Sequence, residues 1–183
     1  KNPDNAFHRK TRVNGVERML CLNEADGKIL WTHEYPCVYQ ISYASGPRVT
    51  PVVAGGKVYS VGAMGHLYCY DADQGTVVWS KDLLKEYKFT VPGWGFSGHP
   101  LIDGDRLSCL VGGEGSVAVA FHKDTGKEIW KNLSAGEPGY APPMIFDIGG
   151  KRQLIVWHPE SVNALEPETG KLLWSQRYNK KQA

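Results

Sequence analysis

The segment Trp157-His158-Pro159-Glu160 places an imidazole two residues from a carboxylate, a pair that a metal site or a general base would use. The six histidines of the chain, however, show no H-x-x-x-H or H-E-x-x-H spacing, so we expect no metal hydrolase. A single histidine without spaced partners is more typical of a polar turn surface. We therefore keep His158 and Glu160 as candidates for ligand binding, and assign no catalytic residue and no metal ligand.

Other nucleophiles and phosphate-binding loops are equally poorly supported. Ser45 and Ser97 lack the G-x-S-x-G turn of serine hydrolases. The glycine-rich run at 112–116 precedes an expected strand, Val117 to Phe121, so no helix N-terminus is available to hold a phosphate. The cysteines form no C-x-x-C pair, which argues against a zinc ribbon and a redox site, and leaves the disulfide state open for Cys21, Cys37, Cys69 and Cys109.

Composition narrows the class of protein further. The 183 residues carry a formal net charge of +2 without a block of like charges, so neither nucleic acid nor a membrane surface is an expected partner. No apolar run approaches the roughly 18 residues that span a bilayer, so no transmembrane segment is expected, and 1–10 lacks the apolar core of a signal peptide. The 21 glycines and six tryptophans favour many short strands joined by turns.

A repeat dominates the chain and has to position these candidate residues. Four segments align: CLNEADGKILW, CYDADQGTVVW, AFHKDTGKEIW and ALEPETGKLLW, which end at Trp31, Trp79, Trp130 and Trp174. The tryptophans are 48, 51 and 44 residues apart, and a glycine stands four residues before each: Gly27, Gly75, Gly126 and Gly170. This period is typical of one propeller blade of four strands.

The second copy shows the pattern of a complete blade. Expected strands are 50–54, 57–62, 66–71 and 76–82, and a turn of helix is possible within 81–88. A proline opens the first strand, where no ladder donor is lost. The first copy has only strands 17–23 and 28–34, after a polar stretch at 1–14 that we interpret as a long loop.

The repeat resembles the quinoprotein-like propellers, whose tryptophan-docking motif is Ala-x-Asp-x-x-x-Gly-x-x-x-Trp. The resemblance implies that the four tryptophans and four glycines of the repeat are structural and pack each blade against the next. We expect an all-β propeller of four-stranded antiparallel blades, with three complete blades and a partial first one, in an eight-bladed ring. The single segment 1–183 divides at 1–35, 36–84, 85–134 and 135–178, with a tail at 179–183; closure with four blades stays an alternative.

The resemblance leaves two functions open, because such propellers include pyrroloquinoline-quinone (PQQ) dehydrogenases and non-enzymatic outer-membrane-assembly proteins. The loops that enter the first strand of each blade should line one mouth, and supply Arg48, Trp94, His99 and Tyr140 beside Trp157, His158 and Glu160. We favour a non-catalytic, periplasmic or otherwise extracytoplasmic module that binds a protein or small molecule there, with further blades of the same polypeptide or a second copy as partners. The alternative is a PQQ- and calcium-dependent oxidoreductase whose cofactor ligands lie partly outside this chain.

Overall fold

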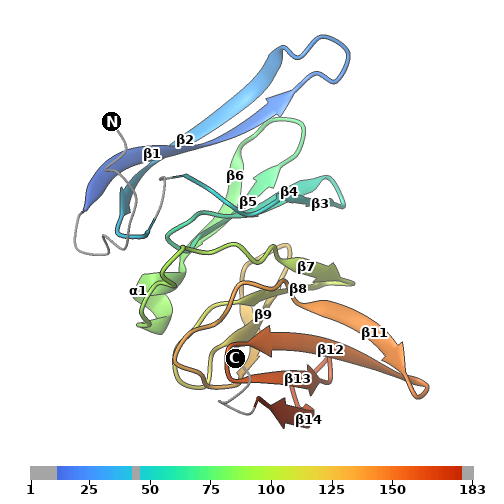
Figure 1. The fold of residues 1–183 in the computed structure, drawn as a ribbon. Coiled ribbons are helices and arrows are strands. Elements are labelled where there is room, and N and C mark those ends of the chain that lie inside the picture. The colour runs from blue at the N-terminus through green and yellow to red at the C-terminus, as the bar shows by residue number, and fades with distance from the viewer. Residues whose placement is uncertain (1–11, 43–45, 179–183) are drawn as a thin grey trace.

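The computed structural model describes residues 12–42 and 46–178, and here it is built from strands with one short helix. The predicted tail at 179–183 lies outside the described residues. Figure 1 shows successive sheets that follow the order of the sequence, from the first hairpin to the last sheet. The hairpin is β1 (Val13–Leu22) with β2 (Ile29–Tyr39), and α1 (Leu83–Tyr87) follows the second sheet.

Three four-stranded antiparallel sheets follow the hairpin, each in the order of the chain. The second sheet holds β3 (Val52–Ala54), β4 (Lys57–Val61), β5 (His66–Asp71) and β6 (Val77–Asp82). The third holds β7 (Leu101–Asp103), β8 (Arg106–Leu110), β9 (Ala118–His122) and β10 (Glu128–Asn132). The fourth holds β11 (Met144–Ile148), β12 (Lys151–His158), β13 (Ser161–Leu165) and β14 (Leu172–Arg177). The predicted all-β fold of four-stranded antiparallel blades is confirmed.

The first hairpin is longer than the sequence predicted. Strand β1 begins at Val13, inside the stretch interpreted as a loop, and β2 continues to Tyr39 instead of ending at Glu34. The reason is burial: alternate residues of β2, including Cys37 and Tyr39, face the second sheet and are buried there. The remaining part of the predicted loop, 1–11, lies outside the described residues.

The helical turn predicted within 81–88 is confirmed as α1. Its N-cap Asp82 is extended, and its side chain accepts a hydrogen bond from the backbone N–H of Lys85 at 3.1 Å. Lys88 ends the helix in the left-handed conformation, with its N–H donating to the carbonyl of Leu84. The helix therefore opens the long loop that leads from the second sheet to the third.

The hydrophobic core lies between the sheets. One cluster joins Tyr59 and Leu67 of the second sheet to Leu107 and Phe121 of the third, and all four are fully buried. A second cluster joins the third sheet to the fourth, with Trp130 against Leu154 among its members. Because each sheet buries its faces against its neighbours, the joints between sheets carry most of the apolar burial that stabilises the fold.

The repeated tryptophans cross these joints. The indole Nε1 of Trp31 donates to the carbonyl of Ala72 at 2.9 Å, that of Trp79 to Lys123 at 2.8 Å, and that of Trp130 to Pro167 at 3.0 Å. Each acceptor belongs to the turn that precedes the last strand of the following sheet. Each joint therefore repeats the same hydrogen bond from one blade to the next.

The repeated glycines lie under the tryptophan rings. A Cβ added to Gly126 would come within 2.8 Å of the Trp79 ring, and Gly75 and Gly170 stand in the same relation to Trp31 and Trp130. Gly126 has a φ of +69°, which disfavours any side chain as well. The close approach of the ring and the positive φ therefore each require glycine at this point of the repeat.

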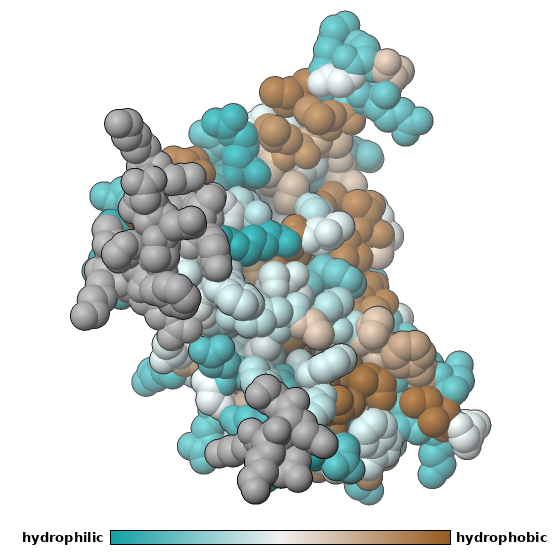
Figure 2. Space-filling model, viewed as in Figure 1, coloured by the Kyte–Doolittle hydropathy of each residue, from teal (hydrophilic) through white to brown (hydrophobic). Residues whose placement is uncertain are grey.

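Two members of the motif, Gly27 of the first copy and Trp174 of the last, have no such contact within the described residues. A Cβ at Gly27 would meet nothing within 4 Å, and Trp174 is 41% exposed and bonds Gln153 of its own sheet at 2.7 Å. Apolar surface shows along the edge of the molecule in Figure 2. The residues that contribute exposed apolar side chains on these two outer sheets include Leu20, Leu22, Ile29, Leu30, Phe146, Leu172 and Leu173. In the described part of the chain, no helix has the length and apolar character to cross a membrane.

We predict that Gly126→Ala destabilises the protein more than Gly104→Ala. Both glycines have positive φ, so each alanine adds about 1–2 kcal/mol of backbone strain. Only the Gly126 variant also pushes against the Trp79 ring, which adds about 1–3 kcal/mol of overpacking, because a Cβ at Gly104 meets nothing within 4 Å. Urea unfolding measures both losses, and equal losses in the two variants would contradict the joint described here.

Candidate functional site

A cavity of about 260 Å³ opens where the loop into the fourth sheet meets the turn between β12 and β13. Its walls come from two segments, 139–141 and 157–159. Three of the residues predicted at the mouth, Tyr140, Trp157 and His158, lie on these walls. The structure thus brings together residues that are 17 and 18 positions apart in the sequence.

Trp94 adds a further aromatic ring beside this cavity, against Tyr140. Its ring centroid lies 5.2 Å from that of Tyr140, and its backbone N–H donates to the Tyr140 hydroxyl at 3.3 Å. On the other side, the rings of Trp157 and Tyr178 lie 6.1 Å apart. Trp94 is 50% exposed and Trp157 is 55% exposed. We call these four residues, Trp94, Tyr140, Trp157 and Tyr178, the aromatic mouth.

His158 is buried, so the interpretation of this residue as polar turn surface is wrong. Only 3% of the residue is exposed, and both of its ring nitrogens form hydrogen bonds within the fold. Nδ1 accepts from the backbone N–H of Glu160 at 3.3 Å, and Nε2 lies 3.0 Å from the Ser161 hydroxyl. Since Nδ1 accepts, the neutral ring carries its proton on Nε2 and donates to Ser161. Its role is to hold the turn behind Trp157.

Burial lowers the pKa of His158 below its ordinary value of 6.5. Desolvation is the main cause, and the nearby Arg177 acts in the same direction, while Glu160 partly opposes it. The folded protein therefore favours the neutral imidazole. This agrees with a ring that accepts a backbone hydrogen bond.

The three other predicted mouth residues do not line the cavity. Glu160 accepts from the backbone N–H of Gly136 at 2.8 Å and so ties the turn to the incoming loop. Arg48 donates to the carbonyl of Gly46 at 2.7 Å, and Nδ1 of His99 donates to the carbonyl of Pro100 at 3.2 Å. For these three residues a part in ligand binding stays a prediction.

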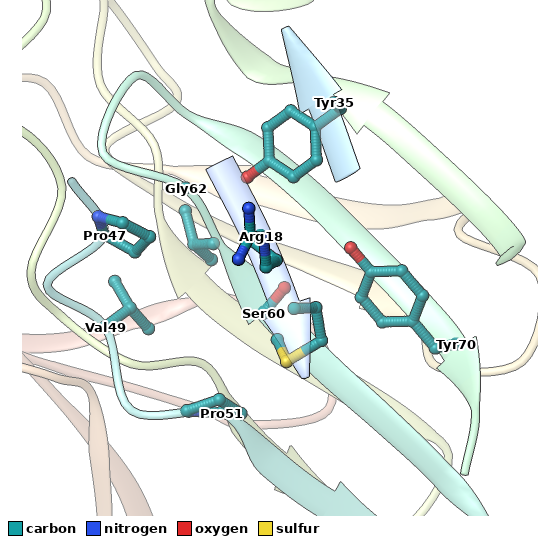
Figure 3. Close-up of a pocket in the computed structure, with 10 residues that line it drawn as sticks. Arg18, Tyr35, Pro47, Val49, Pro51, Ser60, Gly62 and Tyr70 are labelled. Atoms are coloured by element: carbon teal, nitrogen blue, oxygen red, sulfur yellow. The ribbon is translucent and has the colours of Figure 1, made fainter. Parts of the chain in front are cut away.

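A second cavity, which the sequence did not indicate, lies at the joint between the first hairpin and the second sheet. It measures about 110 Å³, and its lining includes Tyr35 of β2 and Tyr70 of β5. Figure 3 shows their hydroxyl groups pointing inward from the two sides. Loop residues Pro47, Val49 and Pro51 close another side of this cavity.

Glu17 of β1 is buried beside this cavity. One carboxylate oxygen accepts a short hydrogen bond from the Tyr35 hydroxyl, and the other accepts from the backbone N–H of Ala63 at 3.0 Å. Burial, and then the bond to Glu17, raise the pKa of Tyr35 well above the ordinary value. The only signal in the sequence is a glutamate at an inward position of an alternating strand, and that signal is weak because exposed strands also carry glutamate.

Calcium with PQQ requires six to eight oxygen ligands at one place. Among the described residues, one group of three potential metal-ligating side chains comes together, Glu17, Cys37 and His66, and it offers a single carboxylate. Two other acidic residues are held in ion pairs, Asp103 with Arg106 and Arg152, and Asp124 with Lys57 and Lys123. Among the described residues, therefore, no cluster of carboxylates offers the oxygen ligands that calcium with PQQ would need.

A known protein family matches most of the chain. The sequence profile described as outer membrane protein assembly factor BamB matches residues 16–183, which is most of the chain. The chain belongs to this family. A search of curated proteins finds no match.

Solved structures show the same fold at low sequence identity. BamB from Moraxella catarrhalis is 19% identical with a TM-score of 0.59, over 87% of this chain and 46% of that one. A europium-containing methanol dehydrogenase is 17% identical with a TM-score of 0.65, over 88% of this chain and 38% of that one. Quinohemoprotein alcohol dehydrogenase from Comamonas testosteroni is 21% identical with a TM-score of 0.52, over 73% and 21%. The chain thus spans less than half of each of these proteins.

We predict that the stability of this BamB-family chain falls on acidification partly through His158. Its folded-state pKa is lowered, so its contribution is complete above about pH 6.5 and is lost as the pH falls through the lowered pKa. His158→Gln should lose less free energy of unfolding than the wild type between about pH 8 and about pH 5. Urea unfolding at both pH values measures this, and the value at the higher pH gives the cost of the substitution itself. An unchanged slope in the variant would contradict the prediction.

Proposed function

We propose that this chain is a non-catalytic β-propeller binding module that holds a segment of a protein partner at the aromatic mouth. The observation that carries the proposal is the exposure of Trp94 and Trp157 beside the cavity that Tyr140 lines. Exposed tryptophan and tyrosine on a fixed framework are typical of the residues that dominate binding energy at protein interfaces. They lose little side-chain freedom when they bind.

The size of the cavity favours a protein segment over a free small molecule. At about 260 Å³ it is smaller than the roughly 300–1,000 Å³ of ordinary small-molecule sites. A single apolar side chain of a partner is therefore the occupant that we propose. The network from His158 through Ser161 to Asn163 supports the rear of the turn, with Ser161 Oγ 3.2 Å from the Asn163 amide oxygen. Such support keeps Trp157 in place for binding.

The class and location of the partner are inferred from the family. The family is named for outer membrane protein assembly, so we propose that the partner is a chain destined for the outer membrane and that the module works outside the cytoplasm. We further propose that Gly27 and Trp174 accept additional blades, from the same polypeptide or a second copy, in a ring of eight. Their uncovered state beside three occupied joints supports this proposal.

The second candidate is a PQQ- and calcium-dependent oxidoreductase. The likeness of its fold to methanol dehydrogenase is the observation in its favour. It requires cofactor ligands outside the described residues. Calorimetric titration of the protein with PQQ and Ca²⁺ distinguishes the two functions. The non-catalytic module should give no heat of binding for PQQ and Ca²⁺, whereas a stoichiometric signal would favour the enzyme.

We predict that Trp157→Ala weakens binding of a partner segment at least about 30-fold. Removing an interface tryptophan of this kind costs about 2 kcal/mol or more, and 1.4 kcal/mol corresponds to tenfold in affinity. The probe is a labelled synthetic peptide in which aromatic and polar residues alternate, as in strands of outer membrane proteins, and fluorescence anisotropy measures its dissociation constant.

Leu30→Ala provides the control for this experiment. Leu30 is 60% exposed on the first hairpin, away from the cavity, so its loss should leave the affinity unchanged. Equal affinity of the wild type and the Trp157 variant would contradict binding at the aromatic mouth.

A further inference from the structure

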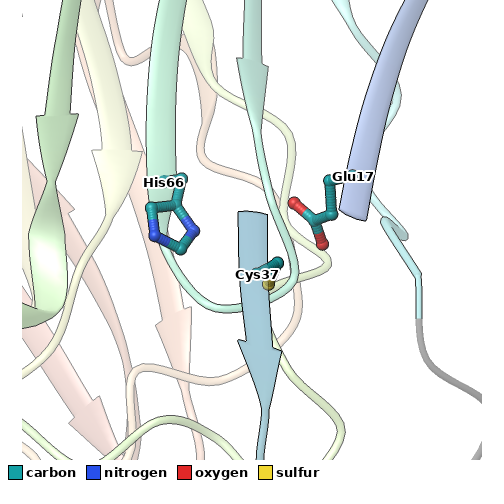
Figure 4. A group of neighbouring side chains, drawn as sticks. All are labelled: Glu17, Cys37 and His66. Carbon is teal, nitrogen blue, oxygen red and sulfur yellow. The ribbon is translucent and has the colours of Figure 1, made fainter. Parts of the chain in front are cut away.

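We propose that Glu17, Cys37 and His66 form a binding site for a divalent cation of the zinc class, at the joint between the first hairpin and the second sheet. The three side chains each offer one ligand atom, and these atoms lie within 4.8 Å of one another. Figure 4 shows Cys37 between the other two, with the carboxylate of Glu17 turned toward it. Small rotations of the side chains bring such atoms to the spacing of a tetrahedral site.

Each ligand comes from a different strand. Glu17 lies on β1, Cys37 on β2 and His66 at the start of β5 in the next sheet. Glu17 and Cys37 face inward because inward and outward residues alternate along both strands of the hairpin, and they are 1% and 2% exposed. The site therefore lies inside the joint, where water does not compete freely for the ligands.

His66 presents an unexplained polar atom to this place. Its Nδ1 is buried and has no hydrogen-bond partner among the described residues. A buried nitrogen without a partner costs free energy, and most such atoms in folded proteins are satisfied. A cation held between His66 and the neighbouring thiol and carboxylate would supply the missing interaction.

The donor set selects the class of cation. A thiolate, an imidazole and a carboxylate suit zinc, whereas calcium and magnesium require oxygen ligands. Binding would displace the proton of the Cys37 thiol to solvent. The Glu17 carboxylate is oriented by the Tyr35 hydroxyl and the Ala63 N–H, which are outer contacts of the kind that fix metal ligands. Three protein ligands leave the fourth position to water or to another group.

The ligand set is confined to this joint of the repeat. Glu17 stands four residues before Cys21, Cys37 stands six after Trp31, and His66 stands three before Cys69. The matching residues at the two later joints are Gly65, Lys85 and Val117, and then Ser116, Gly136 and Ser161. Because the later joints form without these ligands, the blade architecture does not require them, and a separate role accounts for their presence here.

A cation at this position would link the hairpin to the sheet that follows it. The described part of the first blade has two strands, and a two-stranded hairpin is marginally stable alone. Ligands on both sides of the joint would hold the hairpin onto the second sheet. Binding should therefore raise the unfolding temperature of the protein as well as occupy the site.

Titration of the metal-free protein with Zn²⁺ alone, followed by calorimetry, tests the proposal. We expect one equivalent to bind, with an accompanying rise in melting temperature. Cys37→Ser and His66→Gln should each weaken binding more than about tenfold, since even the loss of an outer contact costs 10–100-fold in many metal sites. Cys21→Ser is the matched control, because Cys21 lies on the same hairpin and outside the ligand group. This control should bind zinc as the wild type does.

Cobalt absorption keeps the test independent of how well the variants fold. Wild-type protein loaded with Co²⁺ should show a thiolate-to-cobalt charge-transfer band, and Cys21→Ser should retain it. A wild-type spectrum without this band would overturn the proposal. So would zinc affinity in folded Cys37→Ser equal to that of the wild type.

Discussion

The contact of a tryptophan with the glycine of the following blade is the constraint on which the rest of the structure depends. Each sheet has apolar residues on faces that only a neighbouring sheet can cover, and the large core clusters lie across these joints. The indole fills the joint with apolar area, and its N–H satisfies a backbone carbonyl of the next turn. The glycine permits this approach because it has no Cβ and tolerates the positive φ of the turn. One short motif therefore fixes both the turn and the packing of successive blades.

Because the repeated residues are committed to the joints, specific functions have to use residues that differ from copy to copy. The aromatic mouth does so: Trp157 and His158 end the second strand of the fourth sheet, and the turns after the matching strands of the other two four-stranded sheets are glycine-rich. Glu17, Cys37 and His66 do so as well, since the longer first hairpin reaches over the turn that contains Ala63. The two places lie on different joints, so binding of a partner and binding of a cation can be tested separately.

Much of the fold could be predicted from the sequence because glycine and tryptophan positions determine turns and strand ends locally. Strand β5 was predicted with its observed bounds, 66–71. The length of the first hairpin could not be predicted, because burial of Cys37 and Tyr39 depends on the neighbouring sheet. The burial of His158 was missed for a similar reason, since its partner Ser161 sits across a turn that looks polar. Glu17 and Cys37 are 20 positions apart in the sequence, and Cys37 and His66 are 29 positions apart. These spacings match no recognisable motif, so only the three-dimensional structure brings the three residues together.

The most direct test of the joint is hydrogen exchange of the tryptophan indole N–H groups, followed by NMR. If each indole is bonded to the next blade, Trp31, Trp79 and Trp130 should exchange slowly and together, because exchange then requires the sheets to separate. Trp157, which is mostly exposed at the mouth, should exchange much faster. Exchange of the three joint indoles at the rate of Trp157 would contradict the account.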